Sequence, residues 1–277
     1  MHVPARVARS RLDEALVERG LAPTRSKARA LILAGDILVN DAVSLRAGQP
    51  VASSDNLTLA AKPKFVSRGG DKLDHALSQF GIEVEGLIAA DLGASTGGFT
   101  DCLLQRGVAK VYAVDVGYGQ IDHRLRGDER VVLLERTNAR NLEGLPEPID
   151  VVSIDVSFIS LGLIFPAVAR IMKAGGTCVP LIKPQFEAGR KDVGKGGVVR
   201  DPVVHRRVLE NVIDRARENG SHPVGLVASP LLGPAGNVEF LGHFEFRSET
   251  DVETDVASMI DQALHQAADL ARGVGGA

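Results

Sequence analysis

Short apolar segments alternate with segments of helix length from residue 87 onward. The apolar segments include LIAADLG, VYAVDVG, VVLLERTN, IDVVSIDVS, TCVPLIKP and VEFLGHFEF. Strands that alternate with helices build a parallel sheet covered by helices on both faces. This part of the chain is therefore expected to be α/β and doubly wound, with its ligand beyond the carboxyl ends of the strands. The helices are expected at residues 71–80, 99–106, 161–173, 202–219 and 252–272.

The beginning of the chain carries the opposite charge from the rest. Residues 1–64 hold ten Lys and Arg against six Asp and Glu, whereas the remaining residues hold 22 against 29. A basic module attached to a mildly acidic body favours a polyanion as partner of the module, because lysine and arginine attract phosphates. A solvated basic surface without a partner is the alternative.

The pattern of this basic module predicts two short helices followed by two short strands. Ser10 and Asp13 form a helix-starting box, and Gly20 ends the first helix. Thr24 can cap the second helix, which Gly35 ends. The module is therefore expected to be a small α+β domain.

The residues of this module are similar to those of a known RNA-binding domain. The run RLDEALVERGLAPTRSKARALILAGDILVND resembles the small RNA-binding domain of the S-four ribosomal protein type. The resemblance implies contacts with structured RNA, chiefly with its phosphates, from Arg11, Arg25, Ser26, Lys27 and Arg29. Each of these side chains taken alone is an ordinary surface residue, so the expectation rests on the cluster.

The seam between the two parts is marked by Pro63, which interrupts the strand pattern where the charge balance changes sign. We assign residues 1–62 to the RNA-binding domain, 63–68 to a linker and 69–277 to the α/β domain. Phe65 and its neighbours are either a hinge that couples RNA docking to cofactor affinity or a simple connector.

A glycine-rich turn follows the first strand of the α/β domain, in ADLGASTGGFT. Gly93 and Gly97 allow the backbone to approach a ligand where a side chain would collide. Their spacing is G-x-x-x-G-G, which is not the G-x-G-x-x-G of dinucleotide-binding turns. Asp115 ends the next strand, where an acid can accept hydrogen bonds from ribose hydroxyls. Together these residues predict a site for a nucleoside cofactor.

The pattern D-x-G-x-x-x-G with an acid closing the next strand resembles the S-adenosylmethionine site of Rossmann-like methyltransferases. The resemblance implies that Asp115 contacts the ribose. Asn138, in LERTNAR, either contacts the adenine or bonds to its own backbone. The residues expected to face the methionine end are Gly93, Ala94, Ser95 and Gly97.

Four ionisable residues are expected to converge beside this site. Asp155 ends the strand IDVVSID, and Lys183 ends TCVPLIK, where burying a charge without a partner is costly. Glu239 lies near the start of the last strand, and Lys72 lies in the helix before the first strand. Alone, Lys72 and Glu239 could be solvated and Asp155 could be a turn cap.

In this chain order, the four residues resemble the catalytic tetrad of the FtsJ-like ribose 2′-O-methyltransferases. A ribose hydroxyl must be aligned behind the methyl group for in-line displacement, and a neutral lysine amine can accept its proton. We expect Lys183 to orient and deprotonate the hydroxyl, Asp155 and Glu239 to fix the two lysines, and Lys72 to hold the substrate. This chemistry requires no metal.

Residues 186–199 read FEAGRKDVGKGGVV, with four glycines and three basic residues beside Lys183. The segment is either a surface loop or a mobile basic lid over RNA.

Over residues 10–246 the chain resembles the TlyA family, through VSRGGDKL, AVDVGYGQ, ERTNAR, LIKPQFE and GNVEF. The resemblance implies an S-adenosylmethionine-dependent methyltransferase that modifies cytidine 2′-hydroxyls of ribosomal RNA in the small subunit, the large subunit or both. It also implies an influence on susceptibility to capreomycin-type antibiotics. The partner would be ribosomal RNA or a ribosomal subunit, with no obligate protein partner.

Two other functions stay open at this point, a non-catalytic RNA-binding protein and a membrane-active haemolysin, a label that members of this family also carry. The uncharged apolar stretch at residues 156–169 contains Pro166 and is too short for a bilayer, which takes about 18 apolar residues. No apolar signal-peptide core opens the chain, and Cys102 and Cys178 form neither a metal motif nor a disulfide framework. A cytoplasmic protein without a membrane anchor is therefore expected.

Overall fold

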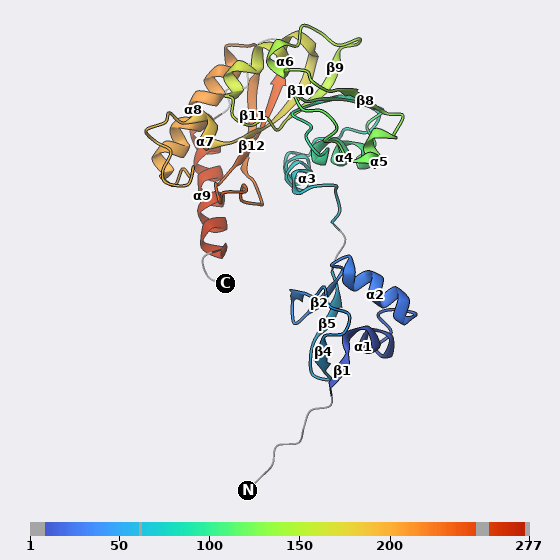
Figure 1. Cartoon of the computed structure of the whole chain (residues 1–277). Coiled ribbons are helices and arrows are strands. Elements are labelled where there is room, and N and C mark those ends of the chain that lie inside the picture. The colour runs from blue at the N-terminus through green and yellow to red at the C-terminus, as the bar shows by residue number, and fades with distance from the viewer. Residues whose placement is uncertain (1–8, 61–62, 248–254, 275–277) are drawn as a thin grey trace. The chain divides into compact units, whose positions relative to one another are not determined.

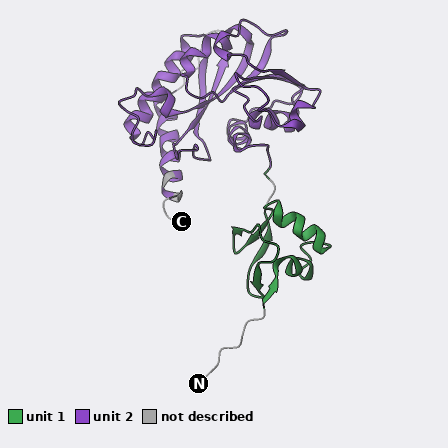
Figure 2. Ribbon diagram, viewed as in Figure 1, with its two compact units in different colours: residues 1–63 green, residues 64–277 purple. Residues whose placement is uncertain are grey.

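The structure is a computed structural model that describes residues 9–60, 63–247 and 255–274. Internal contacts divide the chain into two units, Met1–Pro63 and Lys64–Ala277 (Figure 2). Phe65 is buried in the core of the second unit, and Arg68 begins a helix there. These two residues of the expected linker therefore belong to the second unit by their contacts.

The first unit packs a pair of helices against short strands (Figure 1). Strand β2 pairs with β3 and β5, and β1 pairs with β4, all antiparallel. The elements are β1 (Arg9–Arg11), α1 (Leu12–Glu18), α2 (Arg25–Leu33), β2 (Ile37–Val39), β3 (Ala42–Val43), β4 (Pro50–Ala52) and β5 (Leu57–Leu59).

Local sequence signals explain most of the helix ends in this unit. Thr24 caps α2, because its Oγ1 accepts a hydrogen bond from the backbone N of Lys27 at 3.2 Å. Gly20 and Gly35 adopt positive φ angles just after the two helices. The expected box at Ser10 is wrong, because Ser10 lies in β1 and Arg11 holds the N-cap position of α1 without a side-chain cap.

The second unit is built on a seven-stranded sheet in the order β11-β12-β10-β9-β6-β7-β8. Strand β12 is antiparallel to both of its neighbours, and the other pairs are parallel. The strands are β6 (Ile88–Leu92), β7 (Lys110–Val114), β8 (Val131–Leu134), β9 (Ile149–Ile154), β10 (Met172–Ile182), β11 (His222–Ala228) and β12 (Phe240–Phe246).

Helices cover both faces of this sheet (Figure 1), which confirms the doubly wound α/β fold. Successive strand residues point to opposite faces, so Ala89 packs with α3 and α4, whereas Ala90 packs with α6, α8 and α9. The helices are α3 (Arg68–Phe80), α4 (Gly98–Gln105), α5 (His123–Arg126), α6 (Phe165–Ile171), α7 (Pro184–Glu187), α8 (Pro202–Arg217) and α9 (Val256–Val274).

One expected helix is shorter than the sequence predicts. The segment 161–173 forms a 3-10 turn (Leu161–Leu163) followed by α6, and Met172 already belongs to β10. Met172 is extended because it pairs with Ile149 of β9, so sheet pairing ends the helix early. The first residues of the helix expected at 252–272 lie outside the described residues.

Candidate active site

The glycine-rich turn after β6 passes directly against the end of β9. Gly93 has a φ of +92°, and a Cβ placed on it would lie 2.6 Å from the carbonyl oxygen of Asp155. Only glycine fits such a position, because both the backbone angle and the available space exclude a side chain. The turn and Asp155 are thereby held next to each other.

A cavity of about 280 Å³ opens at the carboxyl ends of β6, β7 and β9. Four of the expected cofactor residues, from different strand ends, line it: Gly93, Ser95, Asp115 and Asn138. Its wall also includes residues that the sequence analysis did not single out: Gln120, Thr137, Ser157, Phe158 and Ile159. This is the location that the doubly wound fold predicts for a ligand.

The backbone fixes the Asp115 carboxylate at the wall of this cavity. Its Oδ2 accepts a hydrogen bond from the N of Ser95, and its Oδ1 accepts one from the N of Gly117, both at 2.7 Å. Each oxygen retains a lone pair for a further donor. The Asn138 Oδ1 accepts from the N of Arg140 at 3.0 Å, so the expected backbone bond is present, although the residue also lines the cavity.

The other two expected cofactor residues lie elsewhere in the turn. Ala94 lines a second, adjoining cavity. Gly97 lines neither of these two cavities; it begins α4 with a φ of +96°, and Leu125 and Ile121 fill the space where its Cβ would be. The described structure therefore gives Gly97 a packing role.

The second cavity, of about 220 Å³, lies between the turn and α3. Lys72 lines it, and Gly93, Ser95 and Asp155 line both cavities. The first turn of α3 approaches closely, because a Cβ on Gly69 would lie 3.7 Å from the Asp155 Oδ2. A ligand in one cavity is therefore next to a ligand in the other.

Both lysines of the expected tetrad are paired with its two acids, and one residue of each pair, Lys72 and Asp155, lines this second cavity. Lys183 lies 2.6 Å from the Asp155 Oδ1 and donates to the Val156 carbonyl at 3.0 Å and to the Ser157 Oγ at 2.9 Å. These contacts use all three donors of an ammonium group. Lys72 pairs with Glu239, and their side chains are only 8% and 1% exposed.

The sheet topology explains how residues so far apart in sequence meet. Asp155 and Lys183 directly follow the parallel strands β9 and β10. Glu239 directly precedes β12, and since β12 is antiparallel to β10, its start lies at the same edge. Lys72 reaches this edge from the first half of α3.

Two neighbours of the tetrad carried no recognisable signal in the sequence. Ser157 accepts from Lys183, although it has no periodic or motif context. Phe158 has a φ of +63° and is 90% exposed, with its ring 4.9 Å from that of Phe186. Large apolar residues rarely adopt a positive φ, so the sequence gives no reason to expect this conformation at Phe158. Its place in the cavity wall is evident only from the structure.

The segment 186–199 is held at its far end by Asn237. The Asn237 side chain donates to the Gly197 carbonyl and accepts from the N of Val199, both at 2.9 Å. The lid function of this segment stays a prediction.

Asp91 is a completely buried acid beneath the glycine-rich turn. Burial, together with the nearby charge of Asp155, raises its pKa to about 7, although a hydrogen bond from Thr100 at 2.7 Å opposes the shift. In the folded protein this acid thus changes its charge close to neutral pH.

Replacing Asp91 with asparagine should make stability less dependent on pH. Because the folded pKa lies above the ordinary 3.8, the folded state of the wild type loses stability as pH rises from about 4 to about 7. The variant lacks this loss, so its free energy of unfolding relative to wild type should rise by about 3 kcal/mol between pH 5 and pH 8, since each pKa unit corresponds to about 1.4 kcal/mol. Urea unfolding of both proteins at each pH measures the difference, and an unchanged difference contradicts a raised pKa.

Comparison with known proteins gives the family of both parts of the chain. Residues 65–246 match the FtsJ-like methyltransferase family, and residues 10–57 match the S4 domain. The chain is 46% identical to the 16S/23S rRNA (cytidine-2′-O)-methyltransferase TlyA of Mycobacterium tuberculosis, over 94% of this chain and 97% of that protein. It is 44% identical to a protein of Brachyspira hyodysenteriae named hemolysin A, over 84% of this chain and 99% of that protein.

Solved structures agree with this result. A Streptococcus thermophilus protein described as a candidate hemolysin is 40% identical and superposes with a TM-score of 0.74, over 98% of this chain and all of that chain. A Lactococcus lactis protein with a similar description is 46% identical with a TM-score of 0.67, over 72% of this chain and 98% of that chain. Among the described residues, no helix is long and apolar enough to cross a membrane. The chain belongs to the TlyA family of FtsJ-like methyltransferases, with an S4 domain ahead of the methyltransferase part.

Proposed function

We propose that the protein transfers a methyl group from S-adenosylmethionine to the ribose 2′-hydroxyl of cytidine in ribosomal RNA. One observation carries this proposal. Two lysine–carboxylate pairs, Lys183 with Asp155 and Lys72 with Glu239, each place one residue, Asp155 and Lys72, in the wall of the second cavity, which adjoins the first cavity with its Asp115 carboxylate. One cavity suits the cofactor and the other suits the sugar that is modified.

The residues of the first cavity fit S-adenosylmethionine. Gly93 leaves room for close approach along the turn, and the Asp115 carboxylate can accept hydrogen bonds from two ribose hydroxyls. Asn138 and Ile159 offer an amide and an apolar surface for a base. The bound cofactor supplies a methyl carbon that is electrophilic because it is attached to a positively charged sulfur.

The residues around the second cavity can align and deprotonate the attacking hydroxyl. Lys183 is fixed by Asp155, and the hydroxyl would replace the Val156 carbonyl or Ser157 as a partner of its Nζ. In its neutral form this amine would accept the proton of the attacking hydroxyl, whose oxygen takes the methyl group as the methyl–sulfur bond of the cofactor breaks and its electron pair stays on sulfur. Lys72, held by Glu239, is placed to contact the sugar or its phosphate.

The substrate class follows from the two parts of the chain taken together. Residues 10–57 match the S4 domain and carry exposed basic residues, which suit the phosphates of structured RNA. The Mycobacterium tuberculosis relative is named for cytidine ribose methylation in 16S and 23S ribosomal RNA. We therefore extend to this chain a substrate in the small subunit, the large subunit or both, presented as ribosomal RNA or as an intact subunit.

Cofactor titration combined with methyl transfer tests the proposal. We expect the purified protein to bind S-adenosylmethionine and to transfer labelled methyl groups to purified ribosomal subunits. Asp115→Ala should weaken cofactor binding by at least about 10- to 100-fold, the value of a single hydrogen bond to a charged group. Wild-type affinity in this variant would mean that the cofactor binds at another site. A lack of methyl transfer to either subunit would contradict the proposed function.

A further inference from the structure

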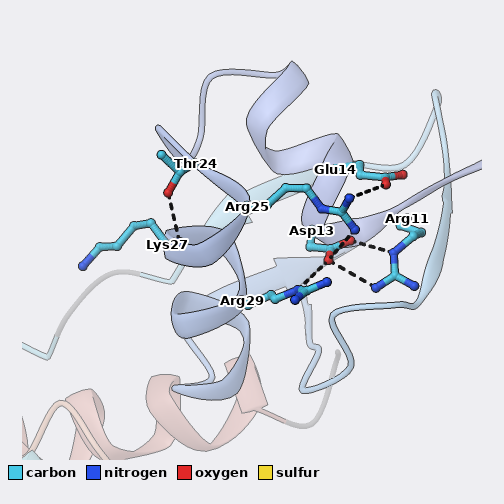
Figure 3. Close-up of polar contacts among 7 residues, drawn as sticks. All are labelled: Arg11, Asp13, Glu14, Thr24, Arg25, Lys27 and Arg29. Atoms are coloured by element: carbon cyan, nitrogen blue, oxygen red, sulfur yellow. Dashed lines mark hydrogen bonds and ion pairs between the residues drawn. The ribbon is translucent and has the colours of Figure 1, made fainter.

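Asp13 has a role that the helix-starting pattern did not predict. It lies in the first turn of α1, and its side chain is 0% exposed because three guanidinium groups surround it (Figure 3). Arg11 Nε lies 3.0 Å from Oδ1, Arg25 Nη2 lies 3.3 Å from Oδ2, and Arg29 Nε lies 2.9 Å from Oδ2. One carboxylate of α1 thus holds three arginines, one from strand β1 and two from helix α2.

Without this carboxylate the three arginines would repel one another. Arg25 and Arg29 are four residues apart in α2, a spacing at which like charges destabilise a helix. Hydrogen bonds from Arg11, and also from Arg29 and Arg25, hold the pKa of Asp13 well below its usual range in spite of desolvation. Asp13 therefore stays ionised across the pH range in which the protein would meet RNA.

The arginines themselves remain accessible. Their side chains are 46%, 47% and 53% exposed for Arg11, Arg25 and Arg29, whereas the acid beneath them is fully covered. A guanidinium carries five N–H donors, and within the described residues Arg29 uses only its Nε. An ion cluster that served only to hold the two helices together would have no need to leave so many donors facing solvent.

The backbone on the other side of Arg11 restricts it further. A Cβ on Gly48 would lie 3.1 Å from Arg11 Nη1, so the guanidinium rests against bare backbone there. The N of Asp13 donates to the Ala47 carbonyl at 3.0 Å, which ties the same segment to α1. Residues 46–50 border an open hollow of about 490 Å³, to which Arg46 adds another positive charge.

We propose that Asp13 is a positioning residue for RNA binding, which holds Arg11, Arg25 and Arg29 as one rigid receptor for backbone phosphates. This inference rests on the proposed function, because it takes RNA as the ligand. Guanidinium forks match phosphate oxygens in bidentate geometry, and fixing them in advance lowers the entropy that binding costs. Lys27 points away from this cluster in Figure 3, so it is not part of the receptor.

Removing the negative charge of Asp13 distinguishes a positioning role in RNA binding from a simple effect of net charge. Asp13→Asn and the matched control Glu14→Gln each remove one negative charge from the first turn of α1. Glu14 is partly exposed and pairs only with Arg25 among the described residues. If only the sum of charges mattered, both variants would bind RNA more tightly. A positioning role predicts that Asp13→Asn binds about tenfold more weakly, whereas Glu14→Gln binds at least as tightly as wild type.

The experiment measures dissociation constants for purified small and large ribosomal subunits over a series of salt concentrations, with thermal unfolding as a check. Arg29→Lys, which keeps both the charge and the exposed position, is the second variant. It should weaken binding severalfold because lysine lacks the fork. Wild-type or tighter binding by Asp13→Asn overturns the proposal, as does an unstable Asp13→Asn together with wild-type binding by Arg29→Lys.

A kinetic readout separates this inference from the proposed function. Asp13→Asn should raise the KM for the ribosomal substrate about tenfold and leave kcat and S-adenosylmethionine affinity unchanged, because Asp13 belongs to the S4 domain. A fall in kcat with an unchanged KM contradicts positioning in RNA binding. If the wild type transfers no methyl group, the proposed function fails, and the affinities of the three variants still decide the role of Asp13.

Discussion

Lys183→Ala is expected to lower the rate of methyl transfer to ribosomal subunits by about a thousandfold, the typical contribution of a positioned general base. The variant removes the amine that contacts Asp155, Val156 and Ser157. S-adenosylmethionine affinity should stay close to that of wild type, because Lys183 does not itself line the cofactor cavity and only contacts residues of its wall, Asp155, Val156 and Ser157. Single-turnover methylation and cofactor titration measure the two quantities separately.

Lys173→Ala is the matched control for this variant. Lys173 lies near the start of β10 and also pairs with an aspartate, Asp150, at 2.8 Å, but it is exposed and far along the strand from the cavities. Its loss should leave methyl transfer unchanged. Wild-type turnover by Lys183→Ala would remove the proposed base, and a parallel loss of cofactor binding would make Lys183 a structural residue.

Glu239→Ala is expected to lower the free energy of unfolding of the second unit by about 3 to 5 kcal/mol. The change removes the carboxylate that pairs with Lys72, whose side chain is only 8% exposed, and an unpaired buried charge is far more costly than a lost surface pair. Methyl transfer should fall as well, because Lys72 lines the cavity proposed for the sugar. Urea unfolding gives the stability, and the methyl-transfer assay gives the activity.

Glu245→Ala provides the comparison, because Glu245 is a carboxylate within β12, the strand that Glu239 directly precedes. Glu245 pairs with Arg247 at 3.0 Å, and both side chains are partly exposed, so its removal should cost less than about 1 kcal/mol. Equal stability losses in the two variants would mean that the Lys72–Glu239 pair is effectively solvated. Stability loss without any loss of activity in Glu239→Ala would limit this pair to a structural role.

The parallel sheet was predictable because each strand is a short apolar run with a helix-length segment after it. The burial of Ala89 and Ala90 on opposite faces follows from the two-residue repeat of a strand, which depends only on local geometry. The end of α6 was not predictable in this way, since Met172 is held by its non-local pairing with Ile149. Tertiary pairing overrides helical pattern at that point.

The same distinction applies to the site. Asp155 and Lys183 were found because they end strands, and strand ends of a parallel sheet meet at one edge. Which lysine pairs with which acid depends on how α3 packs, and no local pattern contains that information. Asp13 was misread for a similar reason: its sequence neighbours suggest a helix start, whereas two of its three arginine partners, Arg25 and Arg29, come from the next helix.

The most direct test of the proposed chemistry is to locate the transferred methyl group. Purified ribosomal subunits are incubated with the wild-type protein and labelled S-adenosylmethionine, and the RNA is digested to nucleosides for mass spectrometry. A site built from two lysine–carboxylate pairs around a sugar predicts that the label appears in 2′-O-methylcytidine and disappears with Lys183→Ala. Label on a base, or label that persists in Lys183→Ala, would contradict the assignment of these four residues to ribose methylation.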